Sequence, residues 1–275
     1  MTISVLLSVY KSEKPSNLDK ALQSVWFDQT LRPDEIVLIQ DGPLSDSLLS
    51  VIDKWKSILC EKFVVLCNEK NLGLTKSLNK GLSIVKGDFI ARMDSDDISF
   101  PNRFELQLDY MMNHPEVSVL GGGIQEIDEN DNWGHLRLYP LDMKGIVKYI
   151  SKANPLAHPT TFIRRSVFDK GFYYNEKYRK NQDLEFWFRL ISKGFVFANL
   201  SLPVLYFRRT SDTYSKRSSF ISLKSELSIY VSGIYSLYGL FTWRYIFPII
   251  RFCVKILPSS LVRFIYKFFF KKTNL

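Results

Sequence analysis

The chain has only three cysteines among its 275 residues, Cys60, Cys67 and Cys253. None of them stands in a C-x-x-C pair or in another spacing typical of a metal site. Three cysteines in a chain of this length also provide no disulfide framework. This cysteine usage is typical of a reducing compartment, so we expect a cytoplasmic protein.

Acidic residues are missing from the last part of the chain, because no Asp or Glu follows Glu226. Seven basic residues lie beyond Glu226, so only about +2 of the formal net charge of +9 is left for the first 226 residues. They are Arg244, Arg251, Lys255, Arg263, Lys267, Lys271 and Lys272. A nearly neutral body is thus followed by a strongly cationic tail.

The tail also lacks an apolar run long enough for a membrane-spanning helix of about 20 residues. Its basic residues recur at helical spacing from Arg244 to Lys255, and again from Arg263 to Lys271 after the helix-breaking Pro258. Aromatic and aliphatic residues fill the positions between them. Cationic faces backed by apolar residues are typical of helices that lie in a membrane interface. Anionic lipid would contribute about 1 kcal/mol per basic residue near the surface.

Two other interpretations of the tail are weaker. The helices could instead pack on the body with their charges solvated, but the complete lack of acidic residues favours the membrane. Nucleic-acid binding is the other common use of such charge. The apolar side of the tail and the absence of a basic stripe in the body argue against it, so we expect no nucleic-acid partner.

The first half of the chain alternates between strand and helix patterns. Met1–Leu7 has no basic n-region, so we interpret it as a first strand and not as a signal peptide. Strands are predicted over 3–9, 35–39, 63–66 and 88–93, and helices over 16–25, 48–59 and 74–85, the first of them capped by Ser16. Short connections between these elements predict an α/β fold with a doubly wound, mainly parallel sheet that has helices on both faces.

The second half is less regular. We predict helices over 104–112 and 181–191 and a strand over 117–120 that ends in Gly121–Gly123. These glycines lack G-x-G-x-x-G spacing, so we interpret them as a place of close backbone packing. Residues 131–159 have little periodicity and are expected to form a mobile loop region over the site.

Polar clusters follow the predicted strands, at Ser8–Tyr10, Asp41–Gly42, Asn68–Gly73 and Asp94–Asp97. In doubly wound sheets, ligands bind beyond the carboxyl ends of the strands. Asp94, Asp96 and Asp97 place three carboxylates within four positions, where like charges repel and raise one another's pKa unless a cation lies among them. A divalent cation with oxygen ligands would compensate them, although an acidic surface loop is the plain alternative.

Several segments, in order, resemble one known family. They are Ser4–Tyr10, Ala21–Val25 with Gln29–Thr30, Asp34–Gly42, Asn71–Leu74 with Asn79 and Gly81, Gly87–Asp97, His158–Thr160, and Gln182–Asp183 followed by Trp187 and Arg189–Leu190. On these segments residues 1–210 resemble the family 2 glycosyltransferases of the GT-A fold. The variant Asp41–Leu44 looks most like bacterial transferases of O-antigen and exopolysaccharide assembly.

The resemblance implies roles in donor binding. Asp41 would hold the uracil or ribose of a UDP-sugar, and Asp94 and Asp96 would form the D-x-D pair that holds Mn²⁺ or Mg²⁺. Ser8, Tyr10, Asn71 and Ser95 would line the nucleotide-sugar pocket. Taken alone, Asp41 before a glycine is also a common turn residue.

The resemblance also implies a general base. Asp183 would accept the proton of the acceptor hydroxyl, with Glu185 as the reserve candidate. His158 and Gln182 are possible contacts to the acceptor or the donor sugar. A lone histidine is more often structural, and an aspartate at a helix N-terminus is favoured by the helix dipole without any catalytic role.

We therefore expect a GT-A catalytic domain over 1–225 and amphipathic, membrane-associating helices over 226–275. The expected activity is inverting, metal-dependent transfer of Glc or Gal from a UDP-sugar to a polyprenyl-pyrophosphate-linked saccharide. The expected location is the cytoplasmic face of the bacterial inner membrane. The alternatives are a non-catalytic partner that binds a nucleotide sugar or glycan, and a nucleotidyltransferase, whose Gly-rich basic loop after the first strand is absent here.

Overall fold

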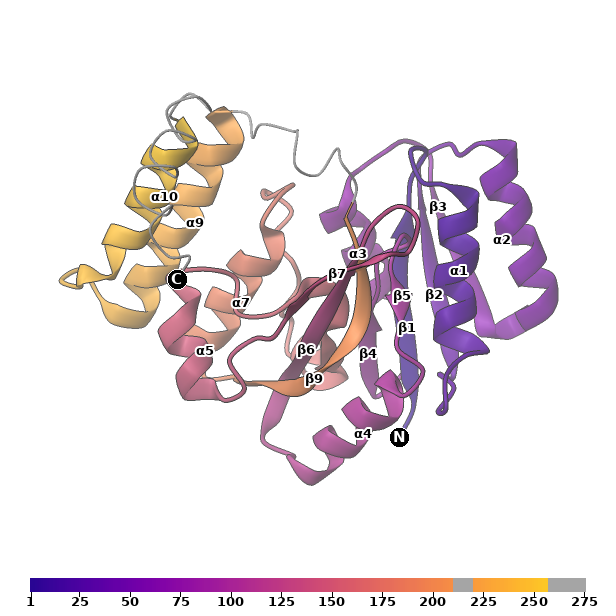
Figure 1. The fold of residues 1–275 in the computed structure, drawn as a ribbon, viewed down its shortest axis with the longest axis horizontal. Helices are drawn as coiled ribbons and strands as arrows, with labels where there is room; N and C mark the ends of the chain where they lie inside the picture. Colours follow the sequence, from indigo (N-terminus) through magenta and orange to yellow (C-terminus); the bar gives the residue numbers. More distant parts are fainter. Residues whose placement is uncertain (210–219, 257–275) are drawn as a thin grey trace, which may run out of the picture.

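The computed structural model describes residues 1–209 and 220–256 of the chain (Figure 1). Its strands are β1 (Ile3–Val9), β2 (Glu35–Asp41), β3 (Phe63–Asn68), β4 (Phe89–Arg92), β5 (Ile98–Ser99), β6 (Val117–Ile127), β7 (Trp133–Arg137), β8 (Phe162–Arg164) and β9 (Val196–Arg208). Its α-helices are α1 (Pro15–Trp26), α2 (Asp46–Leu59), α3 (Leu74–Leu82), α4 (Arg103–Asn113), α5 (Met143–Ile150), α6 (Arg165–Asp169), α7 (Gln182–Ser192), α9 (Phe220–Tyr238) and α10 (Ile246–Ile256). Three 3₁₀ turns are η1 (Cys60–Lys62), η2 (His158–Thr160) and η3 (Trp243–Tyr245).

The strands form one sheet in the order β3-β2-β1-β4-β8-β6-β9-β5, and β7 pairs with β6. The four strands from β3 to β4 are parallel, as the strand–helix alternation predicts. The sheet is mixed beyond them, because β8 runs antiparallel to both β4 and β6. The α/β fold is confirmed, and the second half of the chain adds antiparallel pairs beside the parallel pair of β6 and β9.

Helices cover both faces of the sheet, which explains the nearly continuous apolar strands. Alternate strand residues point to opposite faces, so Val5 belongs to a buried cluster with residues of α1, α2 and α4, while Leu6 belongs to one with residues of α3, α5 and α7. Two buried clusters therefore lie on either side of the sheet. In Figure 1, α1 and α2 lie at one end of the molecule, and α9 and α10 lie side by side at the other.

The three central glycines lie inside β6 and do not end it. A Cβ at Gly121 would lie 2.2 Å from Asn199 Oδ1, and a Cβ at Gly122 would lie 2.6 Å from Val204 Cγ2. Both partners belong to β9, which pairs with β6 in parallel. The predicted close packing is therefore confirmed, but the predicted end of the strand at these glycines is wrong.

Two further sequence expectations are wrong. Residues 131–159 are not a loop region, because they contain β7, α5 and η2. Helix α5 has a weak sequence pattern, because it is short and buries only Ile146 and Ile150. Helix α1 begins at Pro15, so Ser16 lies in its first turn and does not cap it.

Helix α9 packs on the body through α7, and α10 packs on α9. A Cβ at Gly233 of α9 would lie 2.2 Å from the ring of Phe188, and this ring meets that of Tyr230 edge to face at 6.0 Å. Within residues 1–209 and 220–256, the helices fall short of the length and apolarity that crossing a membrane requires. The predicted division between residues 225 and 226 falls within α9 and stays a prediction. Pro258 and the basic residues after it lie outside the described residues.

Candidate active site

A cleft of about 1030 Å³ opens beyond the carboxyl ends of β1, β2 and β4. It brings together all of the residues predicted to bind the nucleotide sugar and the metal, namely Ser8, Tyr10, Asp41, Asn71, Asp94, Ser95 and Asp96. These residues lie at or after the ends of β1, β2 and β4 and in one further loop. Because the three strands are parallel, their carboxyl ends meet at one edge of the sheet. The cleft is large enough for a nucleotide sugar.

Asp41 fixes the loop that forms one wall of this cleft. Its Oδ1 accepts a hydrogen bond from the backbone N–H of Leu72 at 2.8 Å, and its Oδ2 accepts one from Gly73 at 2.9 Å. The side-chain amide of Asn68 donates to Oδ1 at 3.0 Å. Gly42 has a φ of +91°, and a Cβ there would lie 2.7 Å from the backbone nitrogen of Asn71, so the turn requires glycine. The aspartate thus shapes the wall of the cleft besides facing it.

Asp94 is paired inside the protein. The buried guanidinium of Arg92, at the end of β4, donates to both oxygens of the Asp94 carboxylate. Arg92 is 4% exposed and Asp94 is 31% exposed, so the arginine depends on this partner while the aspartate also faces the cleft. Charge-assisted, bidentate pairs of this kind fix the carboxylate in one orientation.

Asp96 and Asp97 form no ion pair with a basic side chain among the residues that the structure describes. Burial, followed by the neighbouring carboxylates of Asp94 and Glu13, raises the pKa of Asp96 to about 7. Burial, followed by Asp94 and Asp96, raises the pKa of Asp97 well above its ordinary value. One oxygen of Asp97 accepts the backbone N–H of Arg208 at 2.8 Å, and the other has no hydrogen-bond partner among the described residues.

The three aspartates meet the requirements of a divalent cation. A carboxylate oxygen from each of Asp94, Asp96 and Asp97 lies within 4.8 Å of the others. Carboxylate oxygens are the ligands that Mg²⁺ and Mn²⁺ prefer. A bound cation would also relieve the repulsion that raises the pKa values of Asp96 and Asp97. The residues present therefore fit such an ion.

The cleft includes charged residues that the sequence analysis did not single out. Glu13 accepts a hydrogen bond from Ser95 Oγ at 2.8 Å, and Lys14 forms an ion pair with Glu129 at 3.3 Å. Arg179 and Lys180 also line the cleft. Glu13 and Lys14 follow the first strand closely, so their position in the chain was an available signal. Glu129 comes from the β6–β7 turn, in a segment with no recognised pattern.

Asp183 lies in the first turn of α7 and is not among the described residues that line the cleft, although Lys180 is. Its Oδ2 accepts a hydrogen bond from the side-chain amide of Asn154. Burial raises the pKa of Asp183, while the backbone N–H of Leu184 and the charge of Arg92 act in the opposite direction. Arg92 therefore acts on the electrostatics of both Asp94 and Asp183.

Glu185, the reserve candidate for the base, is bound to a cation. The Arg189 guanidinium donates to its two carboxylate oxygens at 2.9 and 3.1 Å. The carboxylate of Asp183 lacks an arginine or lysine partner within hydrogen-bond distance among the described residues. Glu185 is thus paired with a cation, whereas Asp183 is bound by the neutral amide of Asn154.

His158 and Gln182 are both buried and lie outside the set of residues that line the cleft. The imidazole Nε2 of His158 lies 2.8 Å from the hydroxyl of Tyr174, and its ring meets that of Trp187 edge to face. Burial lowers the pKa of His158 well below its ordinary value, so the ring is neutral. These contacts describe a histidine that holds η2 against α7.

The site and the fold are those of a known family. A family model described as Glycosyl transferase family 2 matches residues 4–172. The chain is 37% identical to the amylovoran biosynthesis glycosyltransferase AmsE of Erwinia amylovora, over 96% of this chain and 97% of that protein. It is 32% identical to the UDP-Gal:alpha-D-GlcNAc-diphosphoundecaprenol beta-1,3-galactosyltransferase of Escherichia coli, over 96% of this chain and 94% of that protein.

Solved structures share the fold. The S. aureus TarS 1–349 complex with UDP-GlcNAc superimposes with a TM-score of 0.68 at 20% identity, covering 100% of this chain and 77% of that one. A TarS crystal structure of which the chain covers 46% superimposes with a TM-score of 0.65. At this identity the likeness shows the fold alone. With the family match over residues 4–172, the chain belongs to the family 2 glycosyltransferases and has their GT-A fold.

Proposed function

We propose that the chain is an inverting, metal-dependent hexosyltransferase that moves Glc or Gal from a UDP-sugar to a polyprenyl-pyrophosphate-linked saccharide. Its pathway would be O-antigen or exopolysaccharide biosynthesis. The observation that carries this proposal is the single cleft that gathers Asp41, Asp94 and Asp96. The names of the two bacterial relatives support the pathway and, for one of them, a UDP-Gal donor and a lipid diphosphate acceptor.

The donor diphosphate lies beside the acidic cluster. Asp96 and Asp94 would hold Mn²⁺ or Mg²⁺ there, and a carboxylate oxygen of Asp97 lies within 4.8 Å of theirs. When bound, this cation neutralises charge that develops on the UDP leaving group. Ser8, Tyr10 and the wall held by Asp41 surround the nucleotide.

Asp183 is the general base of the proposed reaction. The acceptor hydroxyl oxygen forms a bond to the anomeric carbon while the bond from that carbon to the phosphate oxygen breaks. The electron pair leaves with UDP, and the hydroxyl proton passes to the Asp183 carboxylate. This single displacement inverts the anomeric configuration. Burial favours the protonated form of Asp183, which makes its carboxylate a stronger base than an exposed aspartate.

We also propose that the chain works at the cytoplasmic face of the inner membrane, held there through its C-terminal segment. A lipid-linked acceptor is confined to that surface, so an enzyme confined to the same surface meets it at a higher effective concentration. The basic, acid-free sequence beyond Glu226 supports this attachment.

A transfer assay tests the proposal. Purified protein is incubated with Mn²⁺, a GlcNAc-pyrophosphate-lipid acceptor and a panel of UDP- and other nucleotide-activated sugars. Product with UDP-Gal or UDP-Glc alone, lost on addition of EDTA, is the expected result. UDP binding without transfer from any donor would instead favour a non-catalytic partner, and no UDP binding at all would contradict the proposal.

A further inference from the structure

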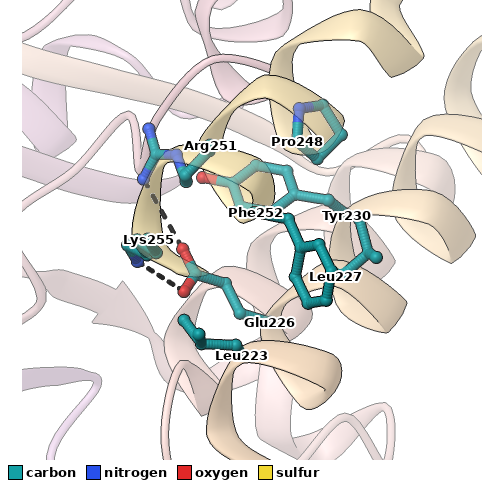
Figure 2. Close-up of a pocket in the computed structure, with 8 residues that line it drawn as sticks. All are labelled: Leu223, Glu226, Leu227, Tyr230, Pro248, Arg251, Phe252 and Lys255. Carbon is teal, nitrogen blue, oxygen red and sulfur yellow. Dashed lines mark hydrogen bonds and ion pairs between the residues drawn. The ribbon is translucent and has the colours of Figure 1, made fainter. Parts of the chain in front are cut away.

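The basic residues of η3 and α10 that the structure describes face the protein. Figure 2 shows Arg251 and Lys255 of α10 turned toward Glu226 of α9, at 3.6 and 2.6 Å. Arg251 also lies 5.5 Å from the ring of Tyr230 and donates to the backbone carbonyl of Lys152. These contacts place the two charges against the body, where they share the one carboxylate of Glu226. The cationic face that helical spacing predicts is therefore turned toward α9.

Arg244, the third of these basic residues, is held in the same way. Its guanidinium donates to the carbonyl of Lys148 at 3.1 Å and lies 4.3 Å from the ring of Tyr238. The cations that share helical spacing from 244 to 255 therefore anchor η3 and α10 to α5 and α9.

The opposite face of α10 is apolar and exposed. Ile246, Ile249, Ile250 and Val254 lie on one side of this helix, and each is between 44% and 54% exposed. In the turn that leads to α10, Phe241 is 97% exposed and Trp243 is 67% exposed. We call these six residues the α10 outer face. Single exposed apolar side chains are ordinary, but a contiguous group of this kind marks an interaction surface.

The charges around this face indicate its partner. Lys144, Lys148 and Lys152 are exposed on or next to α5, and Lys152 lies over the ring of Phe247 at 5.1 Å. The sequence after α10 adds four further basic residues and no acidic one. A lipid surface with anionic headgroups offers both an apolar layer and negative charge. A second copy of the chain would instead bring cations against cations.

We propose that the α10 outer face inserts into the membrane interface, and that Glu226 orients α10 so that this face points outward. Insertion of apolar side chains drives attachment, while the surrounding cations add a preference for anionic lipid. This inference rests on the membrane attachment in the proposed function and names the surface that performs it.

Flotation of the full chain with lipid vesicles tests the inference. The probes are vesicles of phosphatidylcholine alone and vesicles with added phosphatidylglycerol. Ile249→Asn combined with Ile250→Asn should weaken partitioning into both by about tenfold or more, because each lost isoleucine removes apolar burial. Phe241→Ser is the second variant, since its exposed side chain has no packing to lose. Met112→Asn with Leu202→Asn is the matched control, which removes two half-exposed apolar residues elsewhere and should bind as the wild type does.

Unchanged flotation of both outer-face variants would overturn the inference. The inference would also be overturned if light scattering found the wild type to be a dimer and the Ile249→Asn, Ile250→Asn variant to be a monomer, because the face would then bind a second copy.

The contribution of charge is tested by replacing Arg263, Lys267, Lys271 and Lys272 with Gln. This change should reduce the extra binding that phosphatidylglycerol gives and leave binding to phosphatidylcholine intact. Loss of binding to both kinds of vesicle would contradict the inference, because charge and not apolar insertion would then drive attachment. Transfer to a water-soluble acceptor is measured in parallel, since its absence in the wild type would count against the proposed function and not against this surface.

Discussion

The carboxylates around the cleft differ in what surrounds them, and their expected roles differ accordingly. Asp94 is paired with Arg92, whereas burial and neighbouring carboxylates raise the pKa of Asp96. Asp183 lies apart from both and is bound by a neutral amide. Each residue therefore makes a separate prediction.

Asp183→Asn should retain UDP binding and lose transfer by about two orders of magnitude or more, because the acceptor proton loses its base. UDP binding is measured by calorimetry and transfer by product formation. Glu185→Gln is the matched control, since Arg189 already engages both oxygens of that carboxylate. Full transfer by Asp183→Asn would place the base elsewhere.

The same residue predicts a pH dependence. Burial raises the pKa of Asp183, so its proton is held more tightly in the folded protein than in the unfolded chain. The carboxylate must be free for catalysis, so kcat/KM should rise with pH through this raised pKa, above the ordinary value for aspartate. Fold stability has the opposite sign for this group, falling as pH rises from the unfolded to the folded pKa. The profile is measured at saturating Mn²⁺, which keeps Asp96 deprotonated.

Changes at Asp94 and Asp96 should separate stability from metal binding. Asp96→Asn should weaken Mn²⁺ binding in the presence of UDP by at least about tenfold, with little change in stability. Asp94→Asn should also destabilise the fold by about 1–3 kcal/mol, because buried Arg92 loses its carboxylate. Metal titration and urea unfolding of both variants test this. Equal loss of stability in the two would contradict the distinction drawn here.

Secondary-structure elements could be predicted where neighbouring residues in the sequence encode them. The ends of β1, β2 and β4 carry the cleft residues directly in the sequence, so Ser8, Asp41 and Asp94 could be placed at one edge before the structure was known. The pairing of β6 with β9 joins segments about eighty residues apart, which no local pattern encodes. The pairing of Glu226 with Lys255 is likewise a contact between two helices, so helical spacing groups the basic residues on one face but does not show what that face contacts.

The close approach of β6 and β9 makes a prediction at the level of elements. Gly122→Ala should destabilise the fold by about 1–3 kcal/mol, because its Cβ would lie 2.6 Å from Val204 Cγ2 in a buried layer. Val204→Ala alone should also destabilise the fold, because it leaves a cavity. The double variant should lose less than the sum of the two, because each change relieves the other. If urea unfolding showed that the two losses of stability add, the Cβ at residue 122 would be accommodated by a shift of the strands and not by contact with Val204.

The molecule as a whole places its cleft and its proposed membrane surface on different elements. The cleft lies at the strand ends near α1, whereas α9 and α10 lie at the far end of the molecule, where α9 packs on α7, the helix that carries Asp183 (Figure 1). The proposed surface on α10 is thus connected to the proposed base through α9, which contacts both α10 and α7. An acceptor that is anchored in lipid would approach Asp183 from the side of the molecule where the enzyme itself is anchored.

This arrangement predicts how the rate depends on lipid. If enzyme and acceptor share a surface, the rate follows the density of acceptor in that surface and not its bulk concentration. Adding inert lipid at constant bulk acceptor should therefore lower the wild-type rate, about tenfold for a tenfold surface dilution below saturation. The Ile249→Asn, Ile250→Asn variant should start from a lower rate and respond much less, since it meets the acceptor from solution. Identical responses of the two proteins would mean that attachment through α10 does not control access to the acceptor, even if the cleft catalyses the proposed transfer.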